Sequence, residues 1–308
     1  MRKIQTFQPG GFWLVTGAAI LWGTIGVATQ AIYNNDSTTS LFLNLTRMLI
    51  AAPVLLVACW QVVGRTMFII RRRDLLIMLL SGTLLALSQA AYFAAILDTG
   101  VTIATLLTMC IAPVVVTCVS VLLKFEALTR RIVIALICAL IGSVLLVGYH
   151  APDGTHTHLL LGTALSLVAA ITYACMIICG RFVAADYHPL QVTAVNFSAG
   201  ALVLVLVNVA SGIVVVHTLQ GWLLVLYLGL VPTAFAYWLF QKGLRSVSAT
   251  AASIVSMLDP LVAAVLAWLL FGETLAVTGI AGAGLLILSI FLLSSDTKSE
   301  DLAHSVGE

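Results

Sequence analysis

The residues with the clearest chemical potential are an acid and a base well inside long apolar stretches of the sequence, Asp259 and Arg47. A carboxylate near the centre of a membrane-spanning helix costs at least about 2.5–3.5 kcal/mol, so such a group is read first as functional. Pro260 follows the acid directly and frees a backbone carbonyl, which is tolerated only where neighbouring helices or a cavity satisfy it. This combination indicates binding or proton chemistry at membrane depth.

Asp259 is about eleven residues into the apolar stretch 248–270. At the rise of an α-helix this places it roughly 16 Å from the start, close to the middle of a hydrocarbon core of ~30 Å. Ser253, Ser256 and Asp259 follow one another at intervals of three, which predicts one polar face turned toward the helix bundle. The acid either contacts a substrate or a proton, or it caps a broken helix or pairs with Arg47.

Arg47 is about seven residues into the stretch 40–62, roughly 10 Å from its start. An arginine at that depth must pair, reach water or extend to the membrane surface. It is either a structural tie between helices or a clamp for a substrate. No other basic residue lies as deep, so Asp259 is its most economical charged partner.

Aromatic, amide and hydroxyl side chains supply further candidates for the lining of a cavity. Ser81, Ser88 and Tyr92 share one helix face by their spacing of seven and eleven residues. Each residue alone could pack between helices or lie in an interfacial belt. The wider set of possible lining residues is Trp22, Gln89, Tyr92, Tyr173, Asn196, Tyr237 and Trp238. The candidate substrate-binding residues are Asp259, Arg47, Ser256, Trp22, Gln89, Tyr92, Tyr173 and Tyr237.

The elements that must position these residues follow from composition. The chain has 308 residues, of which 61% are hydrophobic and 8% charged, whereas about 25% are charged in ordinary soluble proteins. A net charge of +2 gives no reason to expect a nucleic-acid partner. A helix needs about 20 apolar residues to cross a bilayer. We expect an all-α membrane protein with ten spans in contact with lipid, at 11–32, 40–62, 75–97, 101–123, 131–149, 159–181, 190–211, 220–241, 248–270 and 276–294.

Basic residues mark the orientation. With ten spans, 13 of the 14 Lys and Arg residues fall on the side of the N-terminus, and the fourteenth is Arg47. The positive-inside rule therefore predicts that both termini are cytoplasmic, in a plasma (inner) membrane. The first apolar run, 11–32, is too long for a signal peptide and is expected to be retained. A polar cytoplasmic tail, 295–308, is expected to be mobile.

An internal repeat is visible in two proline–glutamate pairs. Pro113 and Glu126 recur as Pro260 and Glu273, at an offset of 147 (260 − 113 and 273 − 126). Five spans per half is an odd number, so the halves must be inverted in the membrane. We expect two repeats, 1–150 and 151–294. Each glutamate is expected to have a structural role at a helix N-terminus.

Together these features resemble the ten-helix drug/metabolite transporter superfamily, specifically its EamA-type branch. The resemblance covers about residues 11–294 and rests on Arg47, the two proline–glutamate blocks and Trp22-Gly23. Asp259-Pro260 is similar to the family's ninth helix, where Glu is the more usual acid. Ala112 and Tyr173-Ala174 stand at the corresponding positions of the other half, so the halves are not equivalent. The resemblance implies a central cavity formed mainly by helices 1–4 and 6–9, with helices 5 and 10 peripheral.

The expected function is secondary transport, as an exporter of small metabolites such as amino acids or related solutes, by alternating access around a central cavity. The alternatives are a passive channel or a membrane-embedded enzyme. The sequence lacks a nucleotide-binding G-x-x-x-x-G-K-[ST] motif, and its spans lack histidine, G-x-S-x-G and H-E-x-x-H. We therefore expect no enzyme activity and no cofactor.

Two remaining features give weaker expectations. His150, Asp153, His156 and His158 share one loop, but a single H-x-H does not predict a metal site. Gly279, Gly282, Ala283 and Gly284 make one side of the last span small. Such a surface serves either close helix packing or a homodimer.

Overall fold

The computed structural model describes residues 9–124, 126, 128–147, 159–211, 215–216, 218–271 and 276–305. The helices are α1 (Pro9–Asn35), α2 (Ser40–Val63), the 3₁₀ helix η1 (Gly64–Phe68), α3 (Arg72–Leu122), α4 (Arg130–Val147), α5 (Leu159–Val183), α6 (Pro189–Ser211), α7 (Leu219–Leu228), the π-helix η2 (Gly229–Phe235), α8 (Ala236–Gly243), α9 (Ala249–Ser256), α10 (Asp259–Phe271) and α11 (Val277–Ser305). Two short strands, β1 (Ser37–Thr38) and β2 (Val215–Val216), pair in antiparallel fashion.

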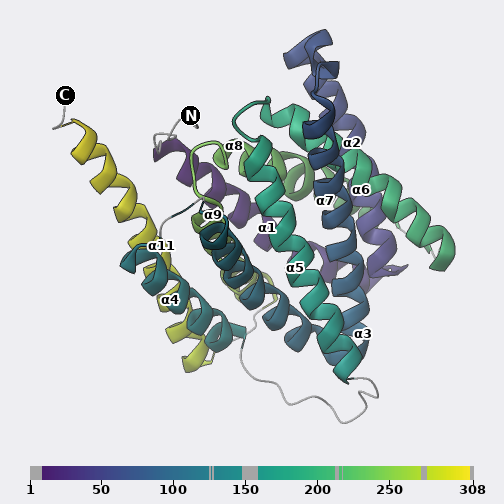
Figure 1. Cartoon of the computed structure of the whole chain (residues 1–308). Coiled ribbons are helices and arrows are strands. Elements are labelled where there is room, and N and C mark those ends of the chain that lie inside the picture. Colours follow the sequence, from purple (N-terminus) through teal and green to yellow (C-terminus); the bar gives the residue numbers. More distant parts are fainter. Residues whose placement is uncertain are drawn as a thin grey trace.

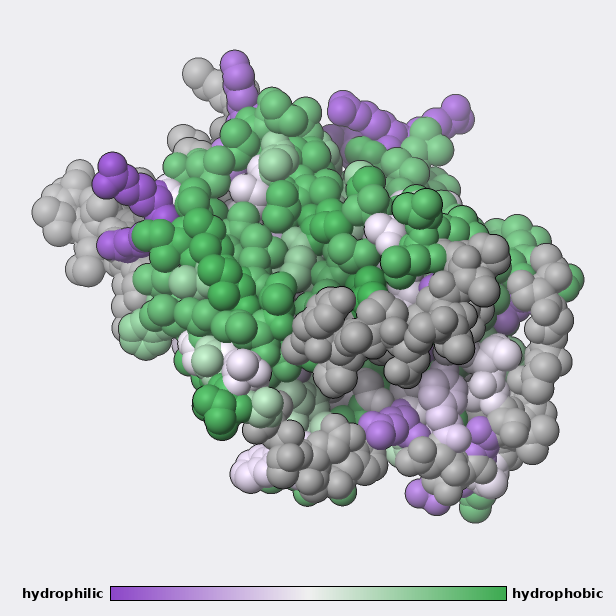
Figure 2. All heavy atoms as spheres, turned by 90° about the horizontal axis from the view of Figure 1, so that it is seen from below, coloured by the Kyte–Doolittle hydropathy of each residue, from purple (hydrophilic) through white to green (hydrophobic). Residues whose placement is uncertain are grey.

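The described helices contain ten stretches long and apolar enough to cross a membrane, as expected. Their bounds lie within a few residues of the predicted ones, apart from the second, Ser40–Phe68, which continues through η1. Large apolar side chains cover the outside of the bundle, for example Leu160 at 89% exposed and Val277 at 83%. Seen from below, most of the described surface in Figure 2 is apolar, with polar residues limited to a few patches. This outer surface suits lipid rather than water.

The third and fourth spans form one helix assignment, α3, where two separate helices were expected. A straight helix of 51 residues would measure about 76 Å, far more than a bilayer. The hydroxyls of Tyr92 and Thr105 are only 2.7 Å apart, although thirteen residues of straight helix would separate them by roughly 20 Å. The helix therefore folds back on itself between its two apolar stretches, Arg72–Ile96 and Ile103–Leu122.

Proline interrupts the eighth and ninth spans. The eighth passes from α7 through the π-helical turn around Pro232 into α8. The ninth breaks at Met257 and Leu258, directly before Asp259-Pro260, where two i→i+3 bonds replace the α-helical pattern. A proline donates no N–H, so the helix before it cannot complete its regular bonding. The two irregular segments lie in adjacent spans, and α1 packs against both.

The helices pack in a regular pattern (Figure 1). α1 packs against α8, α9 and α10, α5 packs against α3, and α2 packs against α6. α4 and α11 form a separate pair at one side of the bundle. Gly142 and Gly282 lie at their contact, where a methyl group on Gly142 would come within 2.9 Å of the Gly282 carbonyl oxygen. Gly282 of the last span thus serves packing within the chain.

The face of the bundle on which α1 begins is called the N face below. It also carries the described residues of four connections, at 64–71, 124, 126 and 128–129, 184–188 and 244–248. α11 ends on the same face in Figure 1. It continues as a helix to Ser305, through most of the polar segment that the sequence predicted from residue 295. The helix simply extends beyond its apolar part.

Each face has a tie between distant connections. On the face opposite the N face, β1 pairs with β2, and the Thr218 N–H donates to Asp36 at 2.9 Å. On the N face, the Tyr187 hydroxyl donates to Asp74 at 2.7 Å. Burial and the Asp74 carboxylate raise the pKa of Tyr187, which keeps the phenol protonated and able to donate.

Candidate binding site within the helix bundle

Asp259 occupies the first turn of α10, where the ninth span is broken. Its side chain is half-buried. Gly23 of α1 makes room for this break, because a methyl group there would lie 2.8 Å from the Asp259 carbonyl oxygen and 2.8 Å from Cγ1 of Val262. The Trp22-Gly23 pair recognised in the sequence thus lets α1 approach the backbone that carries the acid.

Arg47 lies in α2 and is only 7% exposed. Its Nε donates to the Thr233 hydroxyl at 3.1 Å, across the interface between α2 and η2. The guanidinium is within electrostatic range of Tyr237, Asp259 and Tyr33. Arg47 is therefore held at its Nε edge by the second half of the chain, and its charge faces the other candidate residues.

Arg47 and Asp259 are electrostatically coupled but make no direct contact in this conformation. Among the described residues, neither the two Nη atoms of Arg47 nor the Asp259 carboxylate has a hydrogen-bond partner. Buried charges normally acquire such partners, because an unsatisfied ionised group is costly. The two opposite charges therefore remain available to a third group placed between them.

Three tyrosines surround Asp259. Tyr92 of α3, Tyr173 of α5 and Tyr237 of α8 are half-buried and lie within electrostatic range of the acid. Tyr173 is hydrogen-bonded to Ser256, one turn before Asp259. The cluster therefore draws on both halves of the chain.

Trp22 packs against one tyrosine of this cluster. It is only 4% exposed, and its ring centroid lies 4.8 Å from that of Tyr237 and 5.1 Å from that of Phe240. Phe197 supports Tyr237 from another side at 5.0 Å. Gln89 is half-buried on α3, one turn before Tyr92. These residues fix the orientation of Tyr237 or border the cluster.

Other polar residues singled out in the sequence pack between helices. Ser88 donates to the Ala169 carbonyl at 2.9 Å, and Ser81 donates to that of Met176 at 3.4 Å, so both bind α3 to α5. Asn196 is buried beside Ser81 at 3.2 Å. Ser253 donates to the carbonyl of Thr250 within its own helix. The ring of Trp238 lies 5.2 Å from Nζ of Lys242. This position is typical of an aromatic residue in the interfacial belt of a membrane protein.

Thr233 was missed by sequence reasoning, although a signal existed. It follows Pro232 in the middle of an apolar span. The same argument that singled out Asp259 beside Pro260 applies to a hydroxyl beside Pro232, since both prolines disturb backbone bonding at membrane depth. What the sequence lacked was the partner, which lies 186 positions away.

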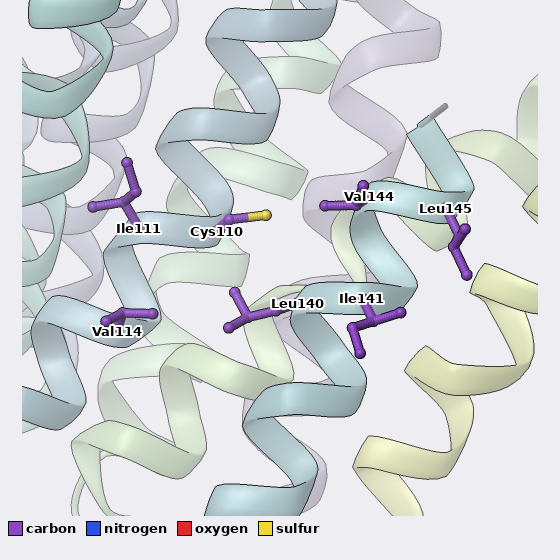
Figure 3. Close-up of a pocket in the computed structure, with 7 residues that line it drawn as sticks. All are labelled: Cys110, Ile111, Val114, Leu140, Ile141, Val144 and Leu145. Atoms are coloured by element: carbon purple, nitrogen blue, oxygen red, sulfur yellow. The ribbon is translucent and has the colours of Figure 1, made fainter. Parts of the chain in front are cut away.

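An open, shallow apolar pocket of about 460 Å³ lies elsewhere, between α3 and α4 (Figure 3). Its lining is entirely apolar or weakly polar: Cys110, Ile111, Val114, Leu140, Ile141, Val144 and Leu145. None of the charged or tyrosine candidates contributes to it. Such a surface suits an acyl chain rather than a polar solute.

Glu126 has a clear structural partner. Its carboxylate accepts from the N–H groups of Ala249 and Thr250 at 2.6 and 3.2 Å, at the start of α9. The expected acid at a helix N-terminus is thus present, on a helix of the other half. Glu273 and the loop histidines at 150, 156 and 158 lie outside the described residues. Within the described part of the chain, no group of three or more His, Cys, Asp or Glu residues could hold a metal ion.

Comparison with known proteins gives consistent matches over most of the chain. The model of the EamA-like transporter family matches residues 9–148 and again 160–295. The uncharacterized transporter YwfM of Bacillus subtilis (strain 168) is 28% identical over 293 residues, which are 94% of this chain and 95% of that protein. An uncharacterized transporter of Archaeoglobus fulgidus is 29% identical, over 89% of this chain and 93% of its own length.

Two further relatives extend this picture. The uncharacterized inner membrane transporter YicL of Salmonella typhimurium (strain LT2) is 28% identical, over 91% of this chain and 94% of that protein. A crystal structure aligns with a TM-score of 0.81 at 17% identity, over 94% of this chain and 98% of the other, which shows the same fold. With ten spans and family matches over both halves, this chain is an integral membrane protein that belongs to the EamA-like transporter family.

Proposed function

We propose that the protein is a secondary transporter that exports small zwitterionic metabolites such as amino acids, by alternating access around the cluster of Asp259, Arg47 and the three tyrosines. The observation that carries this proposal is that Arg47 and Asp259 lie within electrostatic range of each other. The Arg47 Nη atoms and the Asp259 carboxylate bond neither to each other nor to other described residues. A zwitterion would satisfy both charges at once.

The chemistry of the site fits this class of substrate. A guanidinium binds a carboxylate through two parallel N–H groups, and a carboxylate binds an ammonium group. Tyr92, Tyr173 and Tyr237 add ring faces that attract a cation and hydroxyls that accept or donate. A solute with one charge would leave either Arg47 or Asp259 unpaired at membrane depth, which is costly. This difference would give selectivity for zwitterions.

The packing supports one state of an alternating-access cycle. On the N-face side, α9 packs against α1, α3, α4 and α5, whereas α10 on the other side packs mainly against α1 and α4. Arg181 donates to the Leu244 carbonyl at 2.5 Å, and Gln241 donates to that of Gly180 at 2.9 Å, on the N face. We therefore assign this conformation as closed at the N face and open toward the opposite face.

Two inverted repeats, 1–150 and 151–294, would provide the two states. Three observations support them: the offset of 147 between the proline–glutamate pairs, the two separate family matches, and the packing pattern. The packing pattern is the same in both halves when each span is replaced by its counterpart five spans away. The first span, α1, packs against the eighth and ninth spans (α8 to α10), and its counterpart, the sixth span α5, packs against the third and fourth spans (α3). An inverted pair of repeats can exchange conformations and so open the site to either side.

The distribution of basic residues supports a cytoplasmic N face, with both termini inside and the plasma (inner) membrane as the location. The polar segment 295–308 would then be cytoplasmic. A homodimer through α11 would have to use the side of Gly284, which has nothing within 4 Å, because Gly282 packs against α4.

The test is flux in proteoliposomes. We expect saturable movement of labelled amino acids, competed by other zwitterions but not by amino-acid amides, which lack the carboxylate, or N-acyl amino acids, which lack the ammonium group. Two matched control variants each remove one charge of the site: Asp259→Asn removes the negative charge, and Arg47→Gln removes the positive charge. Equal competition by both single-charge analogues would refute the zwitterion site. Flux that never saturates would favour a passive channel, and chemical conversion of the solute would favour a membrane-embedded enzyme.

A further inference from the structure

Pro232 creates a local bonding problem in the eighth span. In an α-helix the carbonyl of Leu228 would accept from the N–H of residue 232, but proline has none. The chain widens into the π-helical turn Gly229–Phe235 at this point. Single π turns inside α-helices are frequent at functional sites.

The Thr233 hydroxyl makes two hydrogen bonds at this turn. It donates to the Leu228 carbonyl at 2.6 Å and accepts from Nε of Arg47 at 3.1 Å. Thr233 is 1% exposed, so competing water is excluded. Because its only proton is used toward Leu228, the oxygen presents a lone pair to Arg47 and can act only as an acceptor there.

A guanidinium offers two edges for a bidentate bond, one formed by Nε with one Nη and the other by the two Nη atoms. Thr233 occupies Nε, while the Nη atoms have no hydrogen-bond partner among the described residues. We propose that Thr233 is a positioning residue, which fixes Arg47 so that its two Nη atoms bind the carboxylate of the substrate. This inference rests on the proposed function and names the atoms that read the anionic group.

A purely structural role for Thr233, sealing the π turn alone, would have different consequences. Loss of the hydroxyl would then loosen the eighth span whether or not residue 47 is an arginine. Under the proposal, the effect of the hydroxyl on binding passes through Arg47. A double-mutant cycle separates the two, because residues that act through one another are not additive.

The experiment measures the dissociation constant of an amino acid for the full chain in nanodiscs, with Thr233→Val and Thr233→Ser in wild-type and Arg47→Gln backgrounds. Valine has a similar shape without the hydroxyl, whereas serine keeps it. We expect Thr233→Val to weaken binding about tenfold or more in the wild-type background, the size of one hydrogen bond to a charged group. We expect no further loss in the Arg47→Gln background and near-normal binding with Thr233→Ser.

A second ligand checks which end of the substrate is affected. The corresponding amine, which lacks the carboxylate, should bind much more weakly than the amino acid, and its dissociation constant should be the same for wild type and Thr233→Val. Equal losses in both backgrounds, or an equal loss for the amine, would overturn the positioning role. Should Thr233→Val fail to fold, Thr233→Ala gives the same comparison. If wild type binds no zwitterion, the proposed function fails. If it binds one and Thr233→Val is unchanged, only this inference fails.

Discussion

The carboxylate of Glu126 accepts the first two N–H groups of α9, from Ala249 at 2.6 Å and Thr250 at 3.2 Å. Glu126 follows the fourth span, and α9 begins the ninth, so the bond joins the two halves of the chain on the N face. The start of a helix carries partial positive charge and unsatisfied N–H groups, so a carboxylate stabilises it. If the N face opens during transport, this contact must break.

We therefore expect Glu126→Gln to favour the state open at the N face. A neutral amide keeps one acceptor but loses the charge, which weakens the closed state by about 1–2 kcal/mol. The measurement is the labelling rate of a single cysteine at Ser256 by a reagent added on the side of the N face. That rate should rise.

Asp186→Asn provides the matched control for Glu126→Gln. Asp186 is an exposed acid in another connection of the N face. Its neutralisation should leave the labelling rate unchanged. A rate that does not differ between the two variants would mean that Glu126 only caps a helix and does not hold the N face closed.

A side chain larger than hydrogen is expected to clash at Gly23 but not at the nearby Gly26. A methyl group at Gly23 would meet Val262 and the Asp259 carbonyl oxygen, whereas one at Gly26 has nothing within 4 Å. We expect Gly23→Ala to destabilise the protein by roughly 1–3 kcal/mol, as overpacking does. Gly26→Ala should be neutral or slightly stabilising, because alanine is the better helix former. Thermal unfolding in detergent compares the two, and equal melting temperatures would contradict the close approach of α1 to α10.

The ten spans could be predicted because about 20 consecutive apolar residues have few other uses. A break in the ninth helix was one of the alternatives that the sequence offered, since Asp259-Pro260 violates both hydropathy and helix bonding in one place. The sequence did not predict that the third and fourth spans would be joined in one helix, α3. Hydropathy separates the two spans but does not show how the backbone between them is hydrogen-bonded. The reversal itself is visible in the Tyr92–Thr105 contact.

The site was harder to predict than the spans. Ser88 and Tyr92 share a face of α3, yet Ser88 bonds to α5 while Tyr92 lies near Asp259. Periodicity gives a face but not its neighbour. In the same way, the sequence marked Glu126 as an acid suited to a helix start but could not identify α9 as that helix. Contacts between distant segments depend on the whole fold.

The β1–β2 pairing affects whether a crosslink on the face opposite the N face is expected to block transport. A crosslink between the ends of the first or second span and the seventh or eighth would be expected to block alternating access. However, Thr38 already pairs with Val215, and Asp36 accepts from the Thr218 N–H. We expect a disulfide between cysteines at Thr38 and Val215 to form readily and to leave transport intact. A full block after oxidation, reversed by reductant, would show that these ends separate during the cycle.

Orientation is testable with single cysteines in a cysteine-free background. With the N face cytoplasmic, a cysteine at Asp36 should react with an impermeant reagent applied to intact cells. A cysteine at Arg72, near the N face, should react only after permeabilisation. The reverse pattern would place the termini outside and refute a cytoplasmic N face.

The last prediction concerns the two central charges. Since Arg47 is bonded to Thr233 and not to Asp259, each single variant should still fold, and the loss should fall mainly on transport. Asp259→Asn should impair flux more than Asp259→Glu, because glutamate keeps the charge, and Arg47→Gln should impair flux more than Arg47→Lys.

The double variant, Asp259→Asn with Arg47→Gln, decides between a structural pair and a binding site. Removing one partner of a structural ion pair leaves an uncompensated charge, which is costly in a buried site, and removing both relieves that cost. A structural pair would therefore regain both stability and flux in the double variant. If each residue binds one end of a zwitterion, the double variant should fold as well as wild type and still show no flux of amino acids. Melting temperature and proteoliposome flux, measured on the same preparations, separate the two outcomes. Full flux in both single variants would exclude this pair from the site and leave Tyr92, Tyr173 and Tyr237 as the residues to test next.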